Sequence, residues 1–104
     1  MTLTTTDATL CLRPEGNLLA SRAKELTATF LAELEGCEAT TVELDLSEVG
    51  EVDSIGVNIV VGLFRECESR GLEYVVTVGD PHVHSLFTLF KLDQWFTVQA
   101  AEHA

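Results

Sequence analysis

The chain has 104 residues, with six Lys and Arg residues against 17 Asp and Glu residues and a formal net charge of −11. This length predicts a single domain over residues 1–104, with one core and no room for a catalytic domain together with a separate binding domain. With 46% hydrophobic and 22% charged residues, the composition excludes an intrinsically disordered chain. The acidic charge argues against nucleic acid or an anionic membrane as a partner, because neutralising phosphates requires clustered Lys and Arg.

The sequence predicts neither a membrane span nor a secretion signal. No apolar run approaches the ~20 residues of a membrane helix, and the N-terminal residues lack the basic flank of a signal peptide. Cys11, Cys37 and Cys67 form neither a disulfide framework nor a zinc pattern, so we expect buried or neutral thiols. Together these features predict a cytoplasmic protein.

The first half of the chain predicts two strands, a helix and a third strand. Weakly alternating, Thr-rich residues favour short strands at 3–6 and 9–13. Apolar residues at helical spacing then predict a helix over 20–35, with Gly36 as its left-handed C-cap. The alternating, β-branched residues 41–46 predict the next strand.

The second half predicts a helix, a strand and a final helix. The strongly apolar segment that follows Ser54 predicts a helix buried on two sides, with Ser54 as its N-cap and Gly71 at its end. The nearly all-apolar run 74–78 predicts a strand covered on both faces. Asp80 and Pro81 then form a strong helix start, as N-cap and first helical residue.

After that helix we expect an apolar stretch packed on the core, made of Leu92, Trp95, Phe96 and Val98, and a frayed tail at 100–104. The element order is therefore strand–strand–helix–strand–helix–strand–helix. It predicts an α/β fold with a mixed, mostly parallel sheet and helices packed on it, the first hairpin forming an antiparallel edge.

Standard catalytic and cofactor signatures are absent from the sequence. There is no Gly-rich nucleotide loop and no His-Glu-x-x-His pair. His82 and His84 are two residues apart on a predicted helix, so they point in different directions and cannot share a metal. The acids within 45–53 could in principle gather Mg²⁺, but no phosphate cradle accompanies them. We therefore expect no enzyme activity, no cofactor and no metal; a small enzyme is the least favoured reading.

The segment Asp53–Gly56 is different, because it lies where a loop meets the most apolar helix. Free N–H groups and the positive dipole end of that helix would tolerate a phosphoryl group on Ser54. The charge of about −2 on the phosphate would add to that of Asp53, enough to release a bound partner. Gly56 would let another protein's backbone approach. A serine at a helix start is also common for structural reasons alone.

Four runs carry a family resemblance: 42–49, 52–57, 74–78 preceded by Gly71, and 86–96. They contain a strand ending in Asp-Leu-Ser, then Asp-Ser-x-Gly before an apolar helix, then Leu-Asp-x-x-Phe. Over nearly its whole length the chain resembles the STAS domain of bacterial anti-sigma factor antagonists.

The resemblance implies a regulatory protein in which Ser54 is phosphorylated by a serine-protein kinase that doubles as the anti-sigma factor. The unphosphorylated form would bind this kinase and free the sigma factor, and a PP2C-type phosphatase would restore that form. The expected contact residues are Leu18, Leu19, Asp53, Ser54, Ile55, Gly56, Val57 and Asn58.

Two positions depart from the family pattern. Leu19 stands where many members carry an aspartate, and Ile55 stands where a small residue is common. An exposed Leu19 would suit a more apolar interface, whereas a buried Leu19 would be packing.

The alternative hypothesis is a STAS domain without a switch, as a subunit of a lipid-transport complex or a stressosome-like scaffold. The sequence does not decide the oligomeric state.

Overall fold

A computed structural model describes residues 2–6, 8–36 and 38–101 of the chain. Its strands join in one sheet in the spatial order β1-β2-β3-β4-β5. β1 and β2 form an antiparallel hairpin, and each later strand runs parallel to the one before it. The bounds are β1 (Thr2–Thr6), β2 (Thr9–Arg13), β3 (Thr41–Leu46), β4 (Glu73–Val78) and β5 (Thr97–Ala100).

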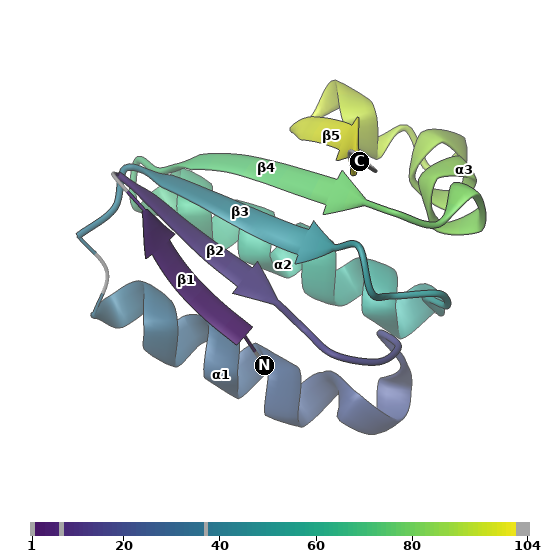
Figure 1. Ribbon diagram of the computed structural model, residues 1–104, viewed down its shortest axis with the longest axis horizontal. Helices are drawn as coiled ribbons and strands as arrows, with labels where there is room; N and C mark the ends of the chain where they lie inside the picture. The colour runs from purple at the N-terminus through teal and green to yellow at the C-terminus, as the bar shows by residue number, and fades with distance from the viewer. Residues whose placement is uncertain (1, 7, 37, 102–104) are drawn as a thin grey trace.

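Helices connect the parallel strands and lie mainly on one face of the sheet (Figure 1). α1 and α2 pack side by side and cover that face, while α3 lies beyond the end of β4, close to β5. Within the described residues no helix covers the opposite face. The bounds are η1 (Ala20–Arg22), α1 (Ala23–Glu35), α2 (Ser54–Ser69), α3 (Pro81–Leu89) and η2 (Leu92–Gln94).

The core lies between the sheet and the pair α1 and α2, and the alternation of the strands creates it. On β3, Val42 and Leu44 are fully buried towards the helices, while Glu43 points to the other face. Phe30 of α1 and Val60 of α2 are also buried. The Tyr74 hydroxyl donates a hydrogen bond to the Val60 carbonyl at 3.0 Å, which ties β4 to α2. Each fully buried large side chain contributes about 1.5–3 kcal/mol.

The predicted α/β class and mostly parallel sheet are confirmed. The prediction that the strand at 74–78 is covered on both faces is wrong in one respect, because helices cover only one of its faces. On the other face Val75 is half-buried, whereas Thr77 is buried and bonds to Glu43 and Gln99. Gly71 has the expected positive φ of 73°, whereas Gly36 has a φ of −93° and is not a left-handed cap.

The C-terminal segment differs most from the expectation. Residues 97–100 form β5, which pairs with Val75–Val78 and was not predicted. Ala101 donates its N–H to the Val78 carbonyl at 2.7 Å, so the frayed tail does not begin at residue 100; residues 102–104 lie outside the described part.

The apolar stretch that leads into β5 is only partly packed. Leu92 and Phe96 are buried and Val98 is half-buried, as expected, but Trp95 is 69% exposed. Phe96 makes an edge contact with the ring of Tyr74, with the ring centroids 5.0 Å apart. Trp95 therefore has to be removed from the predicted core.

Candidate functional site

The N-terminus of α2 is capped by Asp53 and not, as predicted, by Ser54. Asp53 is extended, and its Oδ1 accepts the N–H of Gly56 at 2.8 Å. Its carbonyl accepts the N–H of Val57 at 3.0 Å, the first bond of the helix. Ser54 thus becomes the first helical residue, and its side chain is exposed. A carboxylate competes well with a hydroxyl for a cap, because its charge also interacts favourably with the helix dipole.

Asp53 also joins α2 to the segment that precedes α1. Its Oδ2 accepts the N–H of Ala20, the first residue of η1, at 2.8 Å. The N–H groups of Ala20 and then of Gly56 hold the pKa of the Asp53 carboxyl below its usual range. The carboxylate is therefore charged at neutral pH and fixed in place by both bonds.

A short parallel bridge between Leu18 and Val52 reinforces this connection. Leu18 donates its N–H to the Glu51 carbonyl at 3.0 Å, and its own carbonyl accepts the N–H of Asp53 at 3.2 Å. The Asn17 side-chain oxygen accepts the N–H groups of Gly50 and Glu51 at 3.2 and 3.1 Å. The loops that follow β2 and β3 therefore form one unit at the carboxyl edge of the parallel strands, the edge where α/β proteins commonly bind ligands.

Gly56 is required by packing within the chain. A Cβ atom at this position would lie 2.1 Å from the Leu18 carbonyl oxygen and 2.8 Å from Cγ1 of Val52. The expectation that Gly56 makes room for another protein's backbone is therefore wrong, since the chain's own backbone fills that room. Only glycine lets the start of α2 rest against the Leu18–Val52 bridge.

Three of the predicted contact residues present exposed side chains beside one another at the start of α2. They are Ser54, Asn58 and Ile55, of which Ile55 is 40% exposed although it is a large apolar residue. Leu19 is half-buried and occupies the N-cap position of η1. We call the exposed side chains of Ser54, Ile55 and Asn58 the Ser54 surface.

Three other predicted contact residues are buried. Leu18 has an exposed fraction of 0%, Val57 is 8% exposed, and Gly56 is covered by Leu18. The prediction that the Leu18 side chain contacts a partner has to be corrected, because that side chain belongs to the core. These buried residues pack beneath the exposed side chains of the Ser54 surface and hold the start of α2 in place.

A groove between α1 and α2 begins beside the Ser54 surface, and sequence reasoning missed it. It has a volume of about 390 Å³ and is lined mainly by apolar groups. Gly62 leaves part of it open, because no atom lies within 4 Å of where its Cβ would be. The signal in the sequence was the i, i+7 spacing of Ile55 and Gly62, which puts an apolar side chain and a residue without a side chain on the same face of the helix. The lining includes Ala23, Thr27 and Leu31 of α1, and Ile55, Asn58 and Gly62 of α2.

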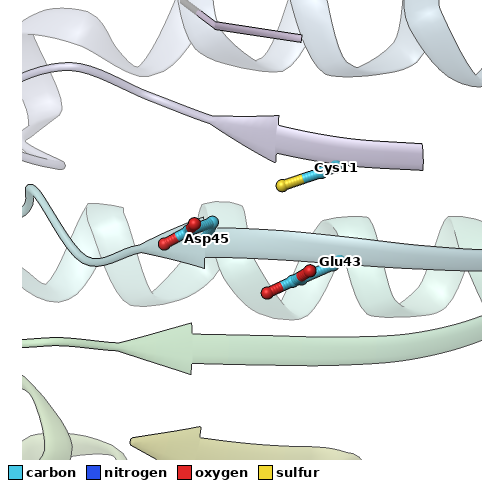
Figure 2. A group of neighbouring side chains, drawn as sticks. All are labelled: Cys11, Glu43 and Asp45. Carbon is cyan, nitrogen blue, oxygen red and sulfur yellow. The ribbon is translucent and has the colours of Figure 1, made fainter. Parts of the chain in front are cut away.

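The uncovered face of the sheet holds a group of neighbouring titratable side chains, shown in Figure 2. Cys11 on β2 and Glu43 and Asp45 on β3 have their ligand atoms within 4.8 Å of one another. Burial, and then the charges of Glu43 and Asp45, raise the pKa of the Cys11 thiol to about 11. The predicted neutral thiol is confirmed for Cys11, and Cys67 is buried, while Cys37 lies outside the described residues.

Asp45 is the most constrained side chain of this group. Its Oδ2 lies 3.0 Å from Nη2 of Arg13, and its Oδ1 accepts the N–H of Ser47 at 2.9 Å. Burial acts to raise the pKa of Asp45, but the hydrogen bonds from Ser47 and the interaction with Arg13 outweigh it, and the pKa lies below its usual value. Asp45 thus lies on the face of the sheet, whereas Asp53 caps α2. The acids of 45–53 therefore do not come together as a magnesium site would require.

Comparisons with known proteins assign the chain to a family. The family model described as STAS domain matches residues 1–104. Within the described residues, no helix is long and apolar enough to cross a membrane.

Solved structures with the same fold share 18–22% of their residues with this chain. A candidate anti-sigma factor antagonist from Thermotoga maritima superposes with a TM-score of 0.87 at 20% identity, covering 96% of this chain and 86% of that one. An anti-sigma factor antagonist from Mycobacterium paratuberculosis gives 0.84 at 18% identity, covering 94% and 82%. The Bacillus cell-fate determinant SpoIIAA in its phosphorylated form gives 0.73 at 22% identity, covering 98% and 91%.

Proposed function

Because the chain belongs to the STAS domain family, we propose that it is an anti-sigma factor antagonist-like regulatory protein, switched by phosphorylation of Ser54. The observation that carries this proposal is the exposed Ser54 side chain in the first turn of α2, where a kinase can reach it. SpoIIAA, which has the same fold, is an anti-sigma factor antagonist with a phosphorylated and an unphosphorylated form. This supports the same chemistry here.

The unphosphorylated Ser54 surface suits a protein partner. Ile55 supplies exposed apolar area, and the exposed Asn58 supplies hydrogen-bonding groups. Burying such a surface favours association, because apolar area is removed from water while the polar rim keeps its hydrogen bonds. We propose that the partner is a serine-protein kinase that acts as the anti-sigma factor, in the cytoplasm, and that a PP2C-type phosphatase reverses the modification.

Phosphorylation would weaken this association through local charge. A phosphate adds about −2 charge beside the Asp53 carboxylate. Asp53 cannot turn away, since the N–H groups of Ala20 and Gly56 hold both of its oxygens. The Ser54 surface would then carry concentrated negative charge that a partner would have to desolvate, which costs far more than burying a hydroxyl.

The test compares wild type with Ser54→Ala in the cells that make the protein. On phosphate-affinity gels we expect wild type to give a shifted band that Ser54→Ala lacks. Ser69→Ala is the matched control, because Ser69 is an exposed serine at the other end of α2; it should keep the shift. A single unshifted wild-type band under every growth condition would overturn the switch and favour the scaffold reading.

Binding supplies the second test. In calorimetric titrations of the serine kinase with each variant, Ser54→Ala should bind as tightly as the unmodified protein. Ser54→Asp should bind at least about tenfold more weakly, because tenfold corresponds to only 1.4 kcal/mol of charge repulsion and desolvation. Equal affinities for the two variants would contradict control at Ser54 even if the gels show modification.

A further inference from the structure

The uncovered face of the sheet carries a cluster of side chains that has no part in the proposed function. Cys11 of β2 is paired with Glu43 of β3 across the parallel ladder, and Asp45 follows on the same face of β3. The Cys11 Sγ and one oxygen of each carboxylate lie within 4.8 Å of one another. Figure 2 shows the three side chains on that face of the two strands. Adjacent strands therefore bring one sulfur and two oxygen donors together.

We propose that Cys11, Glu43 and Asp45 form a binding site for a zinc-like divalent cation. On binding, the Cys11 thiol would release its proton to water, so the ion would meet one thiolate and two carboxylates. This set suits Zn²⁺ and Co²⁺, which accept sulfur and oxygen ligands, whereas Mg²⁺ and Ca²⁺ prefer oxygen alone. Zinc–ligand bonds of about 2.0–2.3 Å place neighbouring ligand atoms about 3.5 Å apart. The three donors would have to approach one another by roughly 1 Å, a shift that side-chain rotation on fixed strands provides.

An ion can reach this cluster from solvent. Cys11 and Glu43 are only half-buried, and no helix in the described part of the chain covers this face. A polar hollow of about 500 Å³ adjoins the cluster, and its lining includes Glu43, Asp45, Thr77 and Gln99. That volume accommodates an ion together with water, which would complete a site supplied with three protein ligands.

Neighbouring groups already orient the two carboxylates. Thr77 donates its hydroxyl to Oε2 of Glu43 at 2.7 Å, and Gln99 donates to the Thr77 oxygen at 3.0 Å. The Ser47 N–H holds Oδ1 of Asp45. Such outer hydrogen bonds fix the direction of metal-ligating carboxylates and strengthen the sites they support.

Arg13 is the competitor of the cation at this site. Its guanidinium lies 3.0 Å from Oδ2 of Asp45, but its side chain is 42% exposed and can turn towards water. The two carboxylates carry one more negative charge than Arg13 neutralises, so the cluster still attracts a cation. An ion bound there would have to displace Arg13 from Asp45, and removal of the guanidinium should therefore tighten binding.

The experiment titrates the full chain with Co²⁺ and Zn²⁺ alone, without any partner. We expect one ion per chain and a Co²⁺–thiolate charge-transfer absorption band. Cys11→Ser should abolish the band, and Cys11→Ser and Glu43→Gln should each weaken Zn²⁺ binding at least about tenfold. Arg13→Gln should tighten it several-fold. Glu68→Gln, at an exposed acid on α2, and Cys37→Ser should leave band and affinity unchanged.

The opposite outcomes overturn the proposal. They are a wild-type chain without the band, a band that survives in Cys11→Ser, or an affinity that falls in Arg13→Gln. Far-UV circular dichroism shows whether each variant folds, and Glu43→Gln decides the question if Cys11→Ser does not fold. Because none of these measurements involves Ser54, their failure would leave the proposed switch untouched.

Discussion

Gly56 and Gly62 lie in the same helix but in opposite surroundings, and mutagenesis can separate the two. A Cβ at Gly56 would lie 2.1 Å from the Leu18 carbonyl oxygen, whereas a Cβ at Gly62 meets no atom within 4 Å. Gly56→Ala must push the start of α2 away from the Leu18–Val52 bridge. We expect the free energy of unfolding, measured in urea, to fall by about 1–3 kcal/mol, as for other forced overpacking.

Gly62→Ala is the matched control for that prediction. Gly62 is exposed within α2, so alanine should increase the free energy of unfolding by about 0.5–1 kcal/mol through its better helix propensity. Urea unfolding of both variants under the same conditions measures this difference in stability. If Gly56→Ala were as stable as Gly62→Ala, the close approach at Leu18 would not exist in solution.

The pH dependence of stability reports on Asp53. Its folded pKa is lowered by the N–H groups of Ala20 and Gly56, so its contribution is complete above the unfolded pKa of about 3.9. That contribution is lost as pH falls from about 4 through the lower folded pKa. Asp53→Asn keeps a cap acceptor but removes the titration, so its free energy of unfolding should fall less over this range. The measurement is urea unfolding at a series of pH values. If the free energy of unfolding fell equally steeply with pH in wild type and in Asp53→Asn, the hydrogen bonds to the Asp53 carboxylate would not stabilise the fold.

At the scale of elements, the two helix caps differ in what they connect. Asp80 caps α3 through one bond, to the His82 N–H at 2.8 Å. Asp53 caps α2 and also binds Ala20 at the start of η1. Asp80→Ala should therefore cost about 1 kcal/mol, the usual value for a lost cap, and Asp53→Ala should lower the urea midpoint about twice as far. Hydrogen exchange should show that Asp53→Ala also exposes the Ala20 amide, which Asp80→Ala should leave protected.

The sequence predicted well those elements whose signals are local. Alternation and β-branching located β3 at Thr41–Leu46, and an Asp-Pro pair located the start of α3. β5 was missed because Thr97–Ala100 is short and, apart from half-buried Val98, exposed. Its only strong determinant is the ladder with β4, which depends on residues distant in the sequence.

The candidate site was predictable in the same uneven way. The position of Ser54 at a helix start follows from local apolar periodicity and was predicted. The burial of Leu18 and the packing of Gly56 follow from the bridge between Leu18 and Val52, a contact that local patterns do not encode. The group of Cys11, Glu43 and Asp45 likewise could not be predicted, because it depends on the register of β2 against β3, which places Cys11 beside Glu43.

At the scale of the whole molecule, the sheet separates two surfaces with different chemistry. One face is closed by α1 and α2; the Ser54 surface lies at the start of α2, and the apolar groove runs from it between the two helices. The other face carries a polar hollow in which Asp45 and Thr77 are buried and Glu43 is half-buried. A partner on the Ser54 surface and a cation on the sheet face could therefore bind at the same time without contact.

The net charge of −11 should make the folded molecule sensitive to salt. Between Lys24 and Arg65 the sequence has nine acids and no basic residue, so repulsion within the compact chain is only partly offset by ion pairs. Added sodium chloride screens this repulsion. At pH 7 we expect roughly 1 kcal/mol of stabilisation between 0.02 and about 0.5 M salt, which raises the melting temperature by about 4–8 °C.

The same measurement at lower pH tests whether net charge is the cause. As the pH approaches the isoelectric point near 4.4, the charge and its repulsion disappear, and the melting temperature should become nearly independent of salt. Sodium chloride is suitable because it is not strongly excluded from protein surfaces, whereas sulfate would stabilise the fold by exclusion at any pH. A salt effect of equal size at both pH values would show that it arises from burial and not from charge.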